Sequence, residues 1–100
     1  IFLDENDNLF SNFWLTTILL KEGSIIDREY LRLSLRKSNI ETRPLWKPMH
    51  LQPVFQDSRA YVNGVSEDLF NRGLCLPSDT NMKDEDLNVV VKKIKEIYAT

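Results

Sequence analysis

Residues 41–55 hold the densest group of side chains that can bind a ligand. The run reads ETRPLWKPMHLQPVF and contains three of the four prolines, the only histidine and one of the two tryptophans. Arg43 and Lys47 add two cations. Each proline restricts φ and lacks an amide donor, so we expect a stiff, extended segment rather than a regular helix or a central strand. Loops with such chemistry are more often sites than packing elements, which makes Arg43, Trp46, Lys47 and His50 the candidate binding residues.

The surrounding elements alternate between strands and helices. We predict strands at residues 13–20, 40–46 and 74–76, because these runs are rich in apolar or β-branched residues and end at turn residues. Helices are expected from the N-cap Asp27 to Ser38, from the N-cap Ser66 to Arg72, and from residue 84 onwards. Gly73 is expected in the left-handed conformation that ends a helix. The order predicts one α/β domain over residues 1–100, a two-layer sandwich in which helices cover one face of a small sheet.

The predicted helices carry clear apolar faces. In the first, Ile26, Tyr30 and Leu33 with Leu31 and Leu35 form the apolar side, and Arg28, Arg32 and Arg36 follow each other at intervals of four. That arginine stripe is either an anion site or a solvated face, and we expect the solvated face. In the last helix, the acidic run at residues 84–86 fits the helix dipole better than a calcium site. Its buried stripe is predicted to be Leu87, Val90, Val91, Ile94 and Ile97.

The composition excludes several functions. A net charge of −2 gives no general reason to bind nucleic acid or an anionic membrane, and no apolar run reaches the length of a bilayer span. One cysteine and one histidine, far apart in sequence, do not make a metal site, and no Gly-rich phosphate loop or nucleophile elbow is present. Cys75 is expected to be a small buried hydrophobic residue. A lone cysteine fits a reducing compartment, so we expect a cytoplasmic protein.

The first residue is Ile1 rather than methionine, and the first three residues are apolar. We interpret the chain as a C-terminal fragment, the alternative being a trimmed small domain. A fragment would expose apolar side chains that once met another domain, and Phe2, Phe10, Phe13 and Phe55 are the candidates.

Three runs together resemble one enzyme family. Residues 41–55, the run SNFWLT at 11–16 and the run SEDLFNRGLCLPS at 66–78 are similar, in the same order, to the C-terminal domain of the DegT/DnrJ/EryC1/StrS sugar aminotransferases. Met82 and the acidic residues 84–86 resemble the start of that domain's last helix. The closest similarity is to the branch that makes perosamine and precursors of bacillosamine-like sugars.

The resemblance implies the aspartate-aminotransferase fold, a pyridoxal 5′-phosphate cofactor and a homodimeric parent enzyme. The substrates it implies are a nucleotide-linked keto sugar, used in cell-surface polysaccharide biosynthesis, and an amino-acid donor. The family's cofactor lysine commonly follows a histidine, but His50 is followed by Leu51. We therefore expect that lysine upstream of Ile1, no catalytic residue in this chain, no cofactor bound to it and no activity on its own.

Substrate binding is what the resemblance implies for residues 41–55. Arg43 would fork onto phosphate or carboxylate oxygens, Lys47 would add a point charge, Trp46 would stack on a sugar or base, and His50 would donate to a hydroxyl. Structural alternatives stand beside these roles. Arg43 can pair with Glu41, Trp46 can fill a gap between domains, Lys47 can face water, and His50 can point away from the cleft. Asn12 and Trp14 could reach the cleft, but we expect a strand-cap asparagine and a core tryptophan. The rival function is a self-standing module that binds a phosphorylated sugar or a peptide.

Overall fold

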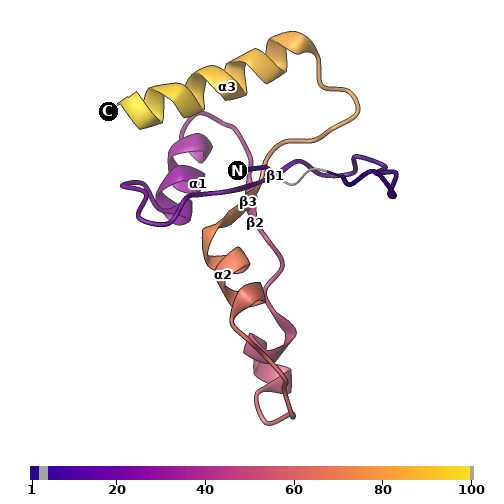
Figure 1. Ribbon diagram of the computed structural model, residues 1–100. Coiled ribbons are helices and arrows are strands. Elements are labelled where there is room, and N and C mark those ends of the chain that lie inside the picture. Colours follow the sequence, from indigo (N-terminus) through magenta and orange to yellow (C-terminus); the bar gives the residue numbers. More distant parts are fainter. Residues whose placement is uncertain (3–4, 100) are drawn as a thin grey trace.

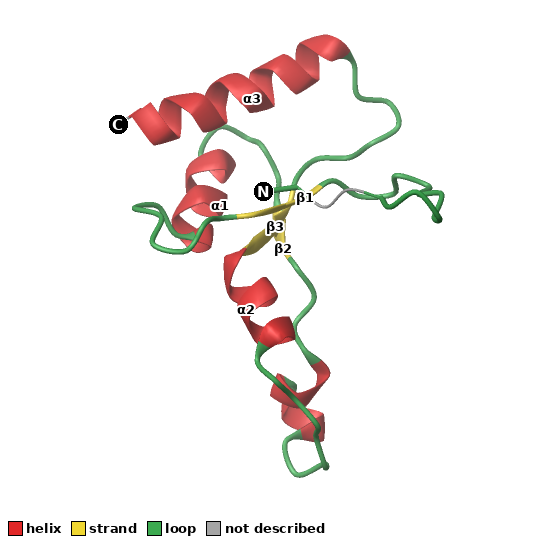
Figure 2. Ribbon diagram, viewed as in Figure 1, coloured by secondary structure: helices red, strands yellow, loops and turns green. Residues whose placement is uncertain are grey.

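The sheet has three short strands. In the computed structural model, which describes residues 1–2 and 5–99, these are β1 (Thr17–Leu19), β2 (Arg43–Pro44) and β3 (Gly73–Cys75). β3 lies in the middle and pairs antiparallel with both neighbours (Figure 2). β2 is therefore an edge strand, a position where a proline without an amide hydrogen is tolerated.

Three α-helices accompany the sheet: α1 (Arg28–Arg36), α2 (Val65–Arg72) and α3 (Asp84–Ala99). The predicted cap of α1 is confirmed, because the Asp27 side chain accepts a hydrogen bond of 2.7 Å from the Tyr30 amide. At the start of α3, the Asp86 carboxylate accepts a bond of 3.0 Å from the Lys83 amide. Acidic residues at 84–86 thus serve the beginning of the helix, as expected.

One hydrophobic core joins α1, α3 and β3. α1 and α3 contact each other and lie at the end of the molecule opposite α2 (Figure 1). The buried cluster consists of Leu20, Ile26, Leu31, Leu35, Ile40, Leu74, Val90 and Ile97. The α/β fold class is confirmed, but α2 does not join α1 and α3 and instead leads away from the sheet.

The segment between β2 and β3 projects from the body as a finger. This finger, residues 45–72, descends through two 3₁₀ turns, η1 (Met49–Leu51) and η2 (Pro53–Phe55), and returns through α2 (Figure 1). The radius of gyration is 15.6 Å, whereas a compact chain of this length has about 13 Å. The finger therefore leaves the chain less compact than a closed domain.

The predicted strand at residues 13–20 is wrong in length. Phe13 has a φ of 49°, in the left-handed region, which interrupts an extended path. Side chains also turn the backbone there, since the Phe13 amide donates to Ser11 Oγ and the Trp14 amide donates to Asn12 Oδ1. Only residues 17–19 remain in the ladder, and the predicted strand at residues 40–46 likewise shrinks to two residues.

Both predicted signals at the ends of α2 are wrong. Gly64, with φ of 85°, is the N-cap, and Ser66 lies inside the helix. Gly73 has φ of −95° and is extended, because it starts β3. A Cβ atom on Gly73 would lie 2.2 Å from Leu45 Cδ1 and 2.5 Å from the Leu69 carbonyl oxygen. This glycine is required for close approach rather than for a left-handed turn.

The proline-rich segment is not extended throughout. Pro48 precedes η1 and Pro53 is the first residue of η2, where a fixed φ near that of a helix and a missing amide cost little. Prolines thus start tight turns here instead of straightening the chain.

Two helical faces also differ from the prediction. Tyr30 and Leu33 are exposed, so the apolar side of α1 is narrower than its pattern, whereas Arg28 is half-buried rather than solvated. In α3, Val90 and Ile97 are buried and Ile94 packs against the core, while Leu87 and Val91 are exposed.

Candidate functional site

A surface pocket lies beside the edge strand β2. Its volume is about 560 Å³, and Arg43 and Trp46 are among its lining residues. The other lining residues come from three places along the chain: Leu15; Glu41, Thr42 and Pro44; and the end of β3 with the segment that follows it, namely Cys75, Leu76, Pro77, Ser78, Asp79 and Met82. The pairing of β2 with β3 brings these segments together, because Arg43 lies opposite Cys75 in the ladder.

Arg43 does not present a free guanidinium. Its Nε and Nη2 donate to the same oxygen of Glu41, at 3.0 and 2.8 Å. Both side chains remain largely exposed, at 78% and 75%. An exposed pair of this kind contributes about 0–1 kcal/mol of stability. Exchanging Glu41 for a phosphate or carboxylate of a ligand therefore costs little.

Trp46 stacks against a second tryptophan that the sequence interpretation assigned to the core. The ring centroids of Trp46 and Trp14 lie 5.9 Å apart, with the planes tilted by 43°. Trp14 is 67% exposed and Trp46 is 65% exposed, so Trp14 is not a core residue. The exposed indole faces beside an arginine place apolar ring surface next to a cation, which is suited to a sugar or a nucleobase carrying phosphate.

Lys47 and His50 lie on the finger and do not line this pocket. The Lys47 side chain is exposed, and its backbone carbonyl accepts a bond of 3.3 Å from Gln52 Nε2. The His50 side chain is only 19% exposed, with Nε2 3.9 Å from Glu67 Oε2 on α2. That separation exceeds a direct hydrogen bond, so the two groups form an ion pair only when the imidazole is protonated. Of the four candidates, the structure brings together Arg43 and Trp46.

Residues that the sequence interpretation did not assign to a site complete the pocket. Glu41 holds Arg43, and Pro77, Ser78, Asp79 and Met82 line the pocket with it, whereas Trp14 packs against Trp46 from outside the lining. Trp14 and residues 77–78 belong to the runs that carry the family resemblance, so a signal for both was present in the sequence. The pairing of Arg43 with Glu41, which the sequence offered as the alternative to a free arginine, is confirmed.

Cys75 is buried and free, as expected. Burial raises the pKa of its thiol above the ordinary value. A thiol in that environment stays protonated at neutral pH and is a poor nucleophile.

Within residues 1–2 and 5–99, no group of three or more His, Cys, Asp or Glu side chains is placed to hold a metal ion. Nor do the described helices include one that is long and apolar enough to cross a membrane.

The pocket does not fit the part of a pyridoxal site that bonds to the cofactor. That bond requires a lysine amine, and no lysine lines the pocket of Arg43 and Trp46. The seven lysines of the chain are Lys21, Lys37, Lys47, Lys83, Lys92, Lys93 and Lys95. The residues present supply a cation, a carboxylate and aromatic faces, which suit a substrate rather than an aldimine.

Comparison with curated proteins identifies longer relatives. The chain is 41% identical over 98 residues to the putative pyridoxal phosphate-dependent aminotransferase EpsN of Bacillus subtilis (strain 168), covering 90% of this chain and 24% of that protein. It is 32% identical over 95 residues to the GDP-perosamine synthase of Escherichia coli O157:H7, covering 95% of this chain and 25% of that protein. The chain thus spans about a quarter of the length of these relatives.

Solved structures share the fold. The Helicobacter pylori aminotransferase PseC, which is involved in the biosynthesis of pseudoaminic acid, superposes with a TM-score of 0.74 at 20% identity, over 85% of this chain and 23% of that one. A DegT DnrJ EryC1 StrS aminotransferase from Brucella abortus gives 0.70 at 23% identity, over 86% and 22%. The model of the DegT/DnrJ/EryC1/StrS aminotransferase family matches residues 2–95. The chain therefore belongs to the DegT/DnrJ/EryC1/StrS aminotransferase family.

Proposed function

We propose that residues 1–100 form the C-terminal small domain of a longer pyridoxal-phosphate-dependent aminotransferase. Its substrate would be a nucleotide-linked keto sugar for cell-surface polysaccharides, and its amino donor an amino acid. The observation that carries this proposal is the family match over residues 2–95, combined with relatives that are about four times longer. The names of those relatives, which include a GDP-perosamine synthase, support a nucleotide sugar.

The role of this domain would be to bind and orient the sugar nucleotide. Arg43 would release Glu41 and fork onto a phosphate oxygen pair, an exchange that conserves the charge-assisted bonds. Trp46, supported by Trp14, would cover a flat face of the sugar or base. Because the pocket already exists beside β2, little ordering is needed when the ligand arrives.

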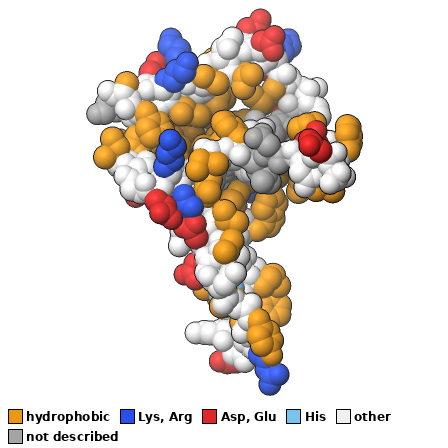
Figure 3. Space-filling view, viewed as in Figure 1, with side chains coloured by type: hydrophobic (Ala, Val, Ile, Leu, Met, Phe, Trp, Pro, Cys, Tyr) orange, Lys and Arg blue, Asp and Glu red, His pale blue; other side chains and the backbone are white. Residues whose placement is uncertain are grey.

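Lys47 and His50 would act from the finger, in a part of the cleft that a second domain or subunit completes. Both side chains lie away from the pocket of Arg43 and Trp46. A homodimeric parent with a shared site would explain why the finger, which also carries Lys47 and His50, exposes apolar side chains among polar and charged ones (Figure 3).

The cofactor would act as the electron sink of transamination. Its lysine would lie in a large domain upstream of residue 1. This chain alone would be inactive, and its apolar side chains Phe2, Phe10, Phe13 and Phe55, which are all exposed, would meet that domain or the second subunit. The cytoplasmic location expected from the lone cysteine stays a prediction.

Two experiments test the proposal. Incubation of the chain with pyridoxal phosphate, followed by borohydride reduction, should give no stoichiometric lysine adduct, and a single adduct would contradict the absence of the aldimine lysine. Calorimetry with GDP- and UDP-linked sugars should show no tight binding to the isolated chain. Micromolar binding without a second domain would favour the self-standing module. An upstream coding sequence with a Ser/Gly-His-Lys motif would support the parent enzyme directly.

A further inference from the structure

The last residue of α2 fastens the finger to the body at two points. The Arg72 guanidinium donates from Nη1 to the Leu20 carbonyl at 2.6 Å, and the Arg72 carbonyl accepts from the Leu20 amide at 3.0 Å. These bonds join α2 to the end of β1, 52 residues earlier in the sequence. Of the described finger side chains, Arg72 is the one that hydrogen-bonds to the body.

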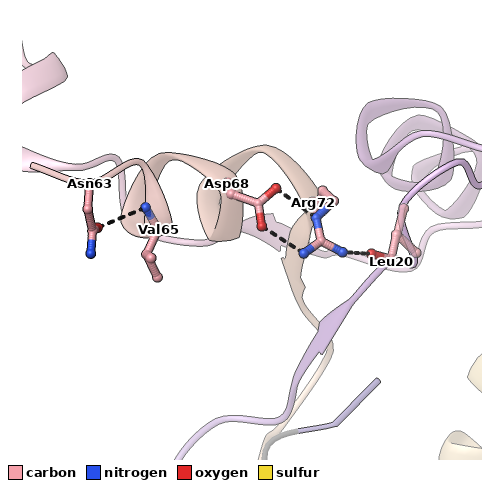
Figure 4. A network of polar contacts seen from close by, with 5 residues as sticks. All are labelled: Leu20, Asn63, Val65, Asp68 and Arg72. Carbon is pink, nitrogen blue, oxygen red and sulfur yellow. Dashed lines mark hydrogen bonds and ion pairs between the residues drawn. The ribbon is translucent and has the colours of Figure 1, made fainter.

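Asp68 holds that guanidinium in place. Asp68 lies one helical turn before Arg72 on α2. Its two carboxylate oxygens accept hydrogen bonds from Arg72 Nε at 2.9 Å and from Arg72 Nη2 at 2.7 Å (Figure 4). All three donor nitrogens of the guanidinium are thereby used, two on the carboxylate and one on the Leu20 carbonyl. Only a planar fork with fixed donor directions can span both partners at once, which a lysine cannot do.

A second fastening lies on α1. The Arg28 guanidinium carbon lies 5.1 Å from the ring centroid of Phe70, on α2. Arg28 Nε and Nη1 are buried and have no hydrogen-bond partner among the described residues. The cation–π contact with the Phe70 ring therefore offsets part of the cost of removing this guanidinium from water. Arg28 thus ties the helix of the finger to the helix that carries the core residues Leu31 and Leu35.

The same helix supports the ligand-binding end of the finger. Glu67 lies one residue before Asp68 and faces His50, with 3.9 Å between Oε2 and Nε2. α2 therefore contacts His50 at its beginning and the body at its end. A change of its direction at Arg72 would displace His50 relative to β2.

We propose that Arg72, ordered by Asp68 and assisted by Arg28 on Phe70, is a positioning residue that sets the direction of the finger relative to the sheet. It thereby sets where Lys47 and His50 lie with respect to Arg43. The geometric role is independent of the ligand, and only its consequence for substrate binding rests on the proposed function.

Pulsed dipolar EPR on the whole 100-residue chain tests this role. Nitroxides attached through Ser58→Cys in the finger and Lys92→Cys on α3 report the distance between finger and body, with Cys75→Ala removing the native thiol. Both labelled positions are exposed. The parent should give one narrow distance peak. Arg72→Met should lose that peak and give a broad distribution, with far-UV circular dichroism unchanged. Arg72→Lys should restore it in part, because it keeps the charge but has one donor nitrogen in place of three.

Arg36→Met, which removes an exposed arginine of α1, is the matched control and should leave the peak unchanged. A narrow, unshifted peak in Arg72→Met would overturn the proposal. If Arg72→Met does not fold, Asp68→Asn and Phe70→Leu decide. Broadening in both supports the role of the fastening, and unchanged peaks in both reject it. No nucleotide sugar enters the measurement, so failure here is distinguishable from failure of the proposed function, which calorimetry and the adduct experiment address.

Discussion

Trp14 and Trp46 bring two distant segments together at the surface, with ring centroids 5.9 Å apart. Trp14 follows the left-handed turn at Phe13, and Trp46 lies at the base of the finger, just after β2. Neither indole is buried in the core, and Trp46 lines the same pocket as Arg43 and Glu41. The contact thus sets one side of the candidate binding surface.

The tryptophan pair should have an optical signature. Two indoles at this distance and tilt couple, so the circular dichroism spectrum should contain an exciton couplet. Trp14→Phe and Trp46→Phe should each abolish the couplet, because each leaves a single indole in the pair. Tyr61→Phe, an exposed aromatic on the finger, is the control and should leave the couplet intact. A couplet that survives either tryptophan substitution would show that the rings do not stack in solution.

Gly73→Ala should destabilise the chain by steric overlap. The new Cβ would meet Leu45 Cδ1 at 2.2 Å and the Leu69 carbonyl oxygen at 2.5 Å, while the extended backbone of Gly73 suits alanine. We expect a loss of about 1–3 kcal/mol in urea unfolding. Leu45→Ala in the same chain should recover part of that loss. It removes the overlap with the Leu45 side chain, whereas the overlap with the Leu69 carbonyl oxygen remains. No recovery would assign the cost to the contact with the Leu69 carbonyl.

Leu31 and Leu33 should respond very differently to truncation. Leu31 is fully buried between the elements of the core, whereas Leu33, two residues away on the same helix, is 43% exposed. Leu31→Ala should lower the free energy of unfolding by about 2–5 kcal/mol. Leu33→Ala removes the same atoms from the same helix and should cost less than about 1 kcal/mol. Equal losses would mean that α1 faces the core with a different side.

Asp68 should make part of the stability dependent on acid. The hydrogen bond from Arg72 lowers the pKa of Asp68 below its ordinary value of 3.8. A carboxyl whose folded pKa is lowered stabilises the fold above its unfolded pKa and loses that contribution as the pH falls through the folded one. The difference in unfolding free energy between the wild type and Asp68→Asn should therefore be constant near neutral pH and shrink below pH 3.8.

The control for Asp68→Asn is the same substitution at an exposed aspartate. Asp57→Asn, in the exposed loop of the finger, should show no comparable change in its difference from the wild type over the same range. Glu29, whose pKa is lowered by its hydrogen bond with Arg32, contributes to the acid loss of the wild type but cancels in each difference. If the difference in unfolding free energy between the wild type and Asp68→Asn does not vary with pH, the carboxylate has no role in stabilising the folded state.

Local patterns were sufficient for some features of this chain. The Asp27 cap, the extent of α1 and α3, the short strand at Leu74 and the burial of Cys75 follow from periodicity, capping residues and turn signals within a few positions. The family resemblance also needed only the order of three short runs, and the match over residues 2–95 confirmed it.

Other features depend on which distant segments meet. Gly73 resembles a helix-ending glycine in sequence, but Leu45 packs where its side chain would lie. Arg28 fits a solvated stripe, but α2 covers it with Phe70. Arg43, Trp46, Lys47 and His50 are close together in the sequence. In the fold, Arg43 and Trp46 line one pocket, whereas Lys47 and His50 lie on the finger and do not line it. The sequence by itself determined the helices and the family, because short-range spacing encodes them, whereas the strand limits, the close approach at Gly73 and the composition of the site were decided by contacts between residues far apart in the chain.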